Sequence, residues 1–201
     1  MTIEVTHPIA DGRTELEGID AFLQTHAQAF LMAGAHRRAN KKATSCSQPD
    51  SADGDATYPE SDVAHSVATM FQTTHQTLVT LQPATVAVQL HGMAERAVCP
   101  NVFVSSGTKT VTSNSKQLLS CMTKMKVEAG VYEGSRDGCP LGATTNVQGR
   151  FSNNEKRDPC NTPAKTALEP GYFIHIEQES SVRRNKESWQ PVIEALKCAF
   201  P

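Results

Sequence analysis

Two histidines stand where predicted strands end. His36 follows the apolar run 30–35, and His91 follows the run 85–90. A third predicted strand, 172–178, carries Glu177. In layered α/β domains, ligands collect at the carboxyl ends of the strands. Two imidazoles and a carboxylate at such a place suit a zinc site, in which the histidines hold the metal and the glutamate acts on its bound water. We therefore interpret His36 and His91 as candidate metal ligands and Glu177 as a candidate catalytic residue.

Further acidic and imidazole groups lie at the start of a predicted helix that opens at residue 61 or 62. Asp62 and His65 are three residues apart and therefore share one face of that helix. Glu60 lies in the approach to the helix, where an acidic side chain can also simply complement the helix dipole. Asp62 and His65 join the candidate metal ligands, and Glu60 remains an alternative to Asp62.

The chemistry expected of Glu177 depends on its burial. A carboxyl group desolvated in the centre of a sheet has a raised pKa, which suits a general base. The alternative is an edge strand with one hydrated face. Four polar or cationic residues in predicted loops could bind a substrate carboxylate or polarise a carbonyl, although an arginine in a loop is often only solvated. These candidate substrate-binding residues are Arg37, Asn146, Arg150 and Arg183.

Hydrophobic periodicity predicts strands and helices in alternation. The predicted strands are 29–35, 85–90, 102–105, 127–132 and 172–178, and the predicted helices are 15–25, 61–81, 115–126 and 186–199. Two polar segments, 37–59 and 133–169, are predicted as long loops, and a loop of such length is usually functional. The order indicates one α/β domain over 1–201, with a mixed, mostly parallel sheet and helices on both faces in three layers.

Composition excludes several classes of protein. The 201 residues carry a net charge of −2, which argues against a nucleic-acid binder. The sequence contains no apolar stretch of about 20 residues, so no membrane span is predicted. The sequence lacks HExxH, GxSxG and phosphate-binding glycine motifs.

Cysteine usage bears on the compartment. Six scattered cysteines favour disulfides and an oxidising, extracellular compartment, although the N-terminus does not read as a signal peptide. Six free thiols in a reduced cytosol are the alternative. Of the possible disulfides we predict the one between Cys139 and Cys160, because this cross-link would stabilise the polar loop between them.

The order of these features carries a family resemblance. A strand followed by His36, an acidic group opening a helix, a strand followed by His91 and Gly92, and a late strand with Glu177 together resemble the zinc-dependent amidohydrolases of the phosphorylase/hydrolase-like fold. N-acetylmuramoyl-L-alanine amidases, phage-type poly-γ-glutamate hydrolases and the more distant zinc carboxypeptidases belong to this group. The resemblance spans about 30–178, but the glycine-rich run usual after the first histidine is replaced by residues 37–40.

The resemblance implies zinc as cofactor, with His36 and His91 as ligands and Glu177 as the base. Glu60, Asp62 or His65 would complete the site. A catalytic zinc has three protein ligands and keeps one position open, so a set of four is one too many: His36, Asp62, His65 and His91. One of these residues is therefore expected to orient another rather than to bind the ion.

The expected activity is hydrolysis of amide bonds in an acidic, peptide-like polymer, such as poly-γ-glutamate or cell-wall peptide, by a secreted monomer. Two alternatives remain open. One is a secreted non-catalytic binding or effector domain on a degenerate hydrolase scaffold. The other is a metal-free glycan or phosphate-ester hydrolase that uses Asp62 and Glu177.

Overall fold

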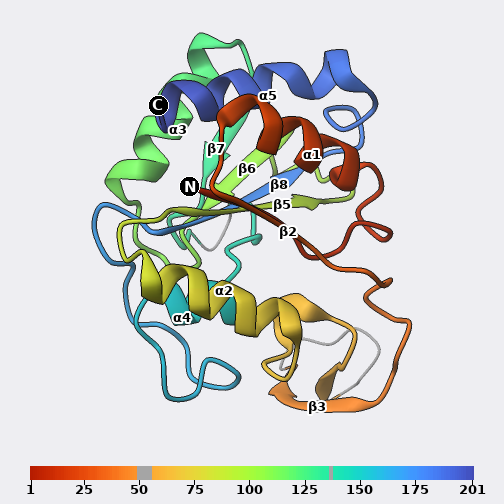
Figure 1. The fold of residues 1–201 in the computed structure, drawn as a ribbon. Coiled ribbons are helices and arrows are strands. Elements are labelled where there is room, and N and C mark those ends of the chain that lie inside the picture. Colours follow the sequence, from red (N-terminus) through yellow and green to blue (C-terminus); the bar gives the residue numbers. More distant parts are fainter. Residues whose placement is uncertain (49–55, 136–137) are drawn as a thin grey trace.

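A six-stranded sheet forms the centre of the computed structural model, which describes residues 1–48, 56–135 and 138–201 (Figure 1). The strands lie in the order β2-β1-β5-β8-β6-β7, and all neighbours are parallel except β6 and β8. Their bounds are Thr2–Val5 (β1), Ala29–Met32 (β2), Ala87–Gly92 (β5), Val102–Ser105 (β6), Ala129–Val131 (β7) and Phe173–Gln178 (β8). The predicted mixed, mostly parallel sheet is confirmed.

Helices cover both faces of the sheet, as the alternating pattern predicts. Helices α1 (Thr14–Thr25), α3 (Ser113–Lys124) and α5 (Lys186–Ala199) lie on one face. Helices α2 (Met70–Leu81) and α4 (Val147–Ser152) lie on the other (Figure 1). A separate two-stranded antiparallel sheet, β3 (Ala43–Ser47) with β4 (Thr57–Pro59), lies away from the main sheet. A short 3-10 helix, η1 (Val63–His65), follows β4.

The two faces of the main sheet differ in chemistry, because successive strand residues point to opposite sides. Toward α1, α3 and α5 the central strands present mainly apolar side chains, which pack into the main core: Ile3, Val5, Val88, Leu90, Ile174 and Ile176. Gln178, at the end of β8, is a buried polar residue on this face, and its side chain donates to Glu17 of α1. Toward α2 and α4 the alternate positions are polar and also buried: Glu4, Gln89, His91 and His175. Buried polar groups are costly unless they are paired. A functional site is therefore expected on the polar face of the sheet.

Several predicted elements differ from the structure. Strand β1 was not expected, because four residues at the chain start give little periodic signal. The segment 37–59 is not all loop, since it contains β3 and β4, although residues 49–55 of that prediction lie outside the described part of the chain. Likewise α4 lies within the predicted loop 133–169, of which residues 136–137 are not described.

The predicted helix 61–81 is divided in two. After η1 the chain is extended at Ser66 and at Thr69, whose side chain accepts a hydrogen bond from the backbone N–H of Gln72. Such a cap satisfies a free amide at a helix start, so α2 begins at Met70. Asp62 and His65 consequently lie before the long helix and are held by a tight turn.

All six cysteines are paired, but not as predicted. The disulfides join Cys46 to Cys160, Cys99 to Cys139 and Cys121 to Cys198. Cys160 therefore links the loop before β8 to strand β3, 114 residues away. The predicted disulfide between Cys139 and Cys160 is wrong. Within the described residues, no helix is both long and apolar enough to span a bilayer.

Candidate metal centre

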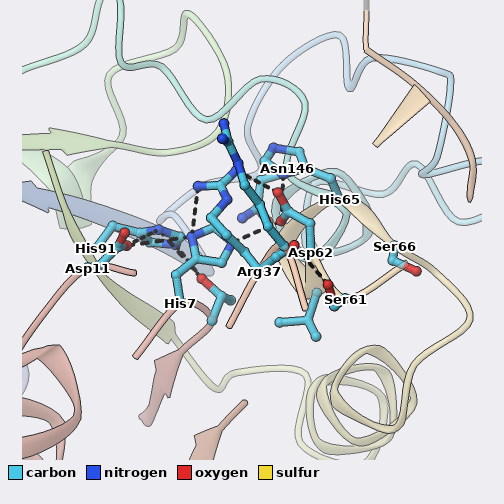
Figure 2. Close-up of polar contacts among 12 residues, drawn as sticks. His7, Asp11, Arg37, Ser61, Asp62, His65, Ser66, His91 and Asn146 are labelled. Atoms are coloured by element: carbon cyan, nitrogen blue, oxygen red, sulfur yellow. Dashed lines mark hydrogen bonds and ion pairs between the residues drawn. The ribbon is translucent and has the colours of Figure 1, made fainter. Parts of the chain in front are cut away.

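Three buried side chains converge beyond the carboxyl ends of β1 and β5. His7 follows β1 by two residues, Asp11 lies in the turn after it, and His91 is near the end of β5. Asp11 Oδ2 lies 3.5 Å from His7 Nδ1 and 3.4 Å from His91 Nδ1. Figure 2 shows the three side chains together. Strands β1 and β5 are adjacent and parallel, so their carboxyl ends bring these residues to one point.

The spacing of these atoms suits a tetrahedral ion. Ligands bound to zinc at about 2.0–2.1 Å in a tetrahedron lie about 3.4 Å from one another. The two separations at Asp11 match that value and exceed the length of a strong charge-assisted hydrogen bond, about 2.8 Å. Asp11 Oδ2 also accepts a hydrogen bond of 3.0 Å from the backbone N–H of Gly92, which holds the carboxylate in place.

The other ring nitrogen of each histidine has a partner that fixes the tautomer. His7 Nε2 lies 2.8 Å from Asp62 Oδ1, and a carboxylate only accepts, so Nε2 carries the proton. His91 Nε2 lies 2.9 Å from Thr6 Oγ1 and 3.3 Å from Gln89 Oε1.

The Gln89 amide is itself oriented, because its Nε2 donates to Glu4 and its Oε1 accepts from Asn146. Nδ1 of each histidine therefore faces Asp11 while Nε2 is hydrogen bonded, and Nδ1 is the nitrogen that would ligate an ion. The residues present fit a divalent cation.

Glu177 lies next to this group. It is the register partner of His91 in the parallel pair β5–β8, so both side chains point to the same face of the sheet. His91, His175 and Glu177 place one ligand atom each within 4.8 Å of one another. His175 Nε2 lies 3.7 Å from Glu177 Oε1. Among the described residues no partner reaches the buried Nδ1 of His175.

A second acidic residue organises the other side of His7. Asp62 Oδ1 contacts both His7 Nε2 and, at 3.0 Å, His65 Nδ1, while its Oδ2 lies 2.5 Å from Arg37 Nη2. The His65 ring stacks on Tyr58 with 3.9 Å between centroids. These distances to Asp62 are those of charge-assisted hydrogen bonds. Asp62 therefore orients His7 and anchors Arg37 and His65 (Figure 2).

Arg37 is more exposed than the carboxylates of the site, with about a third of its side chain accessible to solvent. Its Nη1 lies 3.3 Å from His7 Nδ1, the nitrogen that faces Asp11. A metal ion bound to His7 Nδ1 would exclude the contact between this nitrogen and the Arg37 guanidinium.

The site opens into a cavity of about 310 Å³. Its lining includes the buried groups His7, His91, His175 and Glu177 and the side chains of Arg37, Tyr58 and His65. The segment 140–146 also lines it. A space of this volume admits several atoms of an extended chain beside the metal-ligand candidates.

Burial and neighbouring charges shift the acid–base properties of the group. Burial raises the pKa of Glu177 to about 7, and the nearby Asp11 carboxylate adds to that rise. Burial lowers the pKa of His91 to about 4. For Asp11, burial favours the neutral form, but hydrogen bonds to His7 and His91 outweigh it and hold its pKa well below the usual range. The centre thus combines an ionised carboxylate, a neutral His91 and a second carboxyl that titrates near neutrality.

The sequence-predicted ligands are only partly brought together. His91, Asp62 and His65 all belong to the cluster, and Asp62 and His65 form a group with His7. His36 belongs to no potential metal group within the described residues. It lies beyond the edge strand β2, partly exposed, and its Nδ1 accepts a hydrogen bond from the backbone of Arg38. Glu60 likewise lies apart and pairs with Lys42 and Asn40.

The predicted substrate-binding residues have three different environments. Arg37 lines the cavity, as does Asn146, which also caps α4 and donates to Gln89. Arg150 is buried and donates to the backbone carbonyls of residues 144, 159 and 160. Arg183 is buried against Gly92 and donates to the carbonyls of residues 11, 12 and 178. The guanidinium groups of Arg150 and Arg183 therefore brace loops, and Arg183 supports the turn that carries Asp11.

His7, Asp11 and His175 are the residues that sequence reasoning missed. His7 and Asp11 form an HxxxD pair directly after the apolar alternation of residues 3 and 5, which is the available signal. His175 stands two residues before Glu177 and therefore shares its face of β8. These residues give the cluster its imidazole-rich character.

Comparisons with known proteins identify the fold. No protein-family model and no curated protein matches this chain. Among solved structures, a bacteriophage poly-γ-glutamate hydrolase aligns with 99% of this chain and 82% of its own, with a TM-score of 0.55 and 14% identity. YndL in a zinc-free apo form aligns with 97% and 80%, with a TM-score of 0.50 and 12% identity.

N-formylglutamate amidohydrolase from Ralstonia eutropha JMP134 aligns with 99% of this chain and 91% of its own, at a TM-score of 0.47 and 10% identity. At such identities the likeness is one of fold. The likeness to the poly-γ-glutamate hydrolase and YndL structures confirms, at the level of the fold, the α/β architecture that the resemblance implies.

Proposed function

We propose that this protein is a zinc-dependent hydrolase of amide bonds. One observation carries the proposal: His7 Nδ1 and His91 Nδ1 lie 3.5 and 3.4 Å from Asp11 Oδ2, and Glu177 lines the same cavity as the two histidines. Two imidazoles and one carboxylate are a usual donor set for catalytic zinc, which keeps a fourth position open. The fold shared with a poly-γ-glutamate hydrolase and with YndL, whose structure is described as zinc-free, supports this assignment.

His7, Asp11 and His91 would hold the ion. When bound, zinc would polarise a carbonyl and lower the pKa of a water molecule to about 7. Asp62, Thr6 and Gln89 would keep both imidazoles in the ligating tautomer. This assignment replaces His36 by His7 and moves Asp62 and His65 outside the ligand set.

Glu177 supplies the proton transfer. Its pKa of about 7 lets it accept a proton from the attacking water and return that proton to the leaving amine nitrogen at neutral pH. The register pairing with His91 holds its carboxyl next to the ligands. His175 packs against His91 with 4.3 Å between ring centroids and restricts the room around the Glu177 carboxyl.

The substrate we propose is an acidic, peptide-like polymer such as poly-γ-glutamate or cell-wall peptide. Arg37 lines the cavity at the metal centre and also a neighbouring cavity of about 370 Å³. Arg38 and Lys41 line this second cavity too, so cationic groups extend from the centre toward β3 and β4. Guanidinium groups bind carboxylates strongly and with defined geometry. The three disulfides support secretion.

Metal stoichiometry combined with hydrolysis tests the proposal. The purified protein is stripped with a chelator, titrated with zinc and incubated with poly-γ-glutamate or with muropeptides. We expect one zinc per chain and chain cleavage that requires it. Glu177→Gln should retain zinc and lose about 10²–10⁴-fold in kcat. A folded protein that takes up no zinc at saturation and cleaves neither polymer would instead indicate a binding domain on a hydrolase scaffold.

A further inference from the structure

A second polar constellation lies on the same face of the sheet, away from the metal centre. Ser152 Oγ, at the end of α4, lies 3.0 Å from His75 Nε2 on α2. His75 Nδ1 lies 2.7 Å from Glu4 Oε1 on β1. His75 and Glu4 are fully buried, whereas Ser152 is partly exposed. Three segments far apart in the sequence thus assemble a serine, a histidine and a carboxylate in series.

The protonation states follow from the partners. The Glu4 carboxylate accepts from Gln89 Nε2 through its second oxygen, at 2.8 Å. Because a carboxylate only accepts, His75 Nδ1 carries the proton and donates it to Glu4. The Nε2 lone pair therefore accepts from the Ser152 hydroxyl. The Phe151 ring packs edge-on to His75 with 6.3 Å between centroids and restrains the imidazole. This is the arrangement that activates a serine nucleophile, and it is recognised by geometry rather than by sequence order.

The serine faces a cavity of its own, of about 240 Å³. Pro83 and Thr85 precede β5 and Tyr172 precedes β8, so the cavity lies at the amino ends of strands whose carboxyl ends carry the metal centre. Its lining combines an apolar part, formed by Val79, Pro83, Phe151, Leu168 and the ring of Tyr172, with neutral polar side chains and the ammonium group of Lys156. A small uncharged acyl group suits such a lining.

We propose that Ser152, His75 and Glu4 form a second, metal-independent hydrolytic site for small carboxylic esters. Ser152 Oγ bonds to the ester carbonyl carbon as its proton passes to His75 Nε2. The ester C–O bond breaks, and His75 gives the proton to the departing alkoxide. Water then attacks the acyl-serine and His75 takes its proton, which returns to Ser152 Oγ as the carboxylic acid leaves. Lys156 lines the same cavity and is the cationic group among its lining residues.

Covalent labelling and ester hydrolysis test this site separately from the zinc chemistry. The full-length protein in excess chelator is exposed to a fluorophosphonate and digested, and the adduct is located by mass spectrometry. Hydrolysis of p-nitrophenyl butyrate is measured under the same conditions. We expect the adduct on Ser152 and an ester hydrolysis that resists the chelator.

Ser152→Ala should abolish the adduct and lower ester hydrolysis about 10²-fold or more, with uptake of zinc unchanged. Ser181→Ala, a change at an exposed serine, serves as the matched control and should leave both readouts intact. Absence of an adduct on Ser152 in the folded wild-type protein overturns the proposal and leaves the Ser152–His75 contact as a packing hydrogen bond. Equal ester hydrolysis by Ser152→Ala and wild type overturns it as well. The wild-type labelling decides the question even where the alanine variant fails to fold.

Discussion

His91 and Glu177 are register partners across the parallel strands β5 and β8. Neighbouring strands lie about 4.8 Å apart, so this pairing sets the spacing between a candidate metal ligand and a candidate base through the backbone itself. His7 lies two residues after β1, which is the other neighbour of β5. The central strands therefore form a frame that carries His91 and Glu177, and the loops beyond the strands supply His7, Asp11 and Arg37.

Zinc binding should depend on His7 and His91 but not on His36. We expect His7→Ala and His91→Ala each to weaken zinc binding by at least about 10²-fold, because each removes one of three protein ligands. His36→Ala serves as the matched control and should bind zinc as the wild type does. Calorimetric titration of the chelator-treated proteins measures the affinities. Loss of zinc from His36→Ala with full retention by His7→Ala would refute the ligand assignment.

Arg37 should affect substrate and metal in opposite directions. Arg37→Gln removes a cation that pairs with Asp62 and approaches His7 Nδ1. We expect KM for an acidic polymer to rise about tenfold, since a charge-assisted hydrogen bond contributes about 1.5 kcal/mol or more. Zinc should bind at least as tightly, because the competing contact is gone. Steady-state kinetics with acidic and uncharged amide substrates provide the measurement. An equal rise in KM for both substrates would contradict a carboxylate-binding role.

Buried Glu17 should make the stability of the fold depend on pH. Burial raises its pKa to about 8, and its Oε2 accepts from Gln178 Nε2 at 2.9 Å. The unfolded carboxyl ionises near the ordinary value of 4.5, whereas the folded one keeps its proton to about pH 8. The stabilisation from neutral Glu17 is thus complete below about pH 4.5 and is lost as the pH rises toward 8.

Glu17→Gln removes this ionisation and should gain stability relative to the wild type across that window. We expect the unfolding free energy of Glu17→Gln minus that of the wild type to increase by at least about 1.4 kcal/mol between pH 5 and pH 8. This is the equivalent of one pKa unit. Urea denaturation of both proteins in chelator gives the values without a contribution from metal binding. Parallel pH profiles for the two proteins would show that Glu17 ionises normally in the fold.

The disulfide between Cys121 and Cys198 should contribute strongly to stability. It joins α3 to α5 across 77 residues, and Cys121 is fully buried in the main core. Closing a loop of that length in the unfolded chain corresponds to about 4 kcal/mol in the chain-entropy model. Cys121→Ala with Cys198→Ala should therefore lower the unfolding free energy by about 3–4 kcal/mol in denaturant titrations. Peptide mapping without reductant should recover this pair, and recovery of a Cys139–Cys160 peptide would contradict the structure.

Local patterns in the sequence accounted for much of the framework. Alternating apolar residues located β5 and β8, and period-3.6 patterns located α1, α3 and α5 to within two residues. The polar residue at the end of each central strand, His91 or Glu177, is visible in the same alternation. Such signals are local, because a side chain's face depends only on its position along its own strand or helix.

The tertiary structure alone decided which histidine accompanies His91. His36 and His7 each follow a short strand, and both strands run parallel to β5 and β8. Strand β1 lies between β2 and β5, however, so its carboxyl end meets that of β5, whereas β2 forms the edge of the sheet. Strand order and cysteine pairing depend on contacts between segments far apart in the chain. The pattern within a single segment carries no information about such contacts. For that reason the candidate metal centre, the disulfides and the Ser152–His75–Glu4 series emerged only from the folded chain.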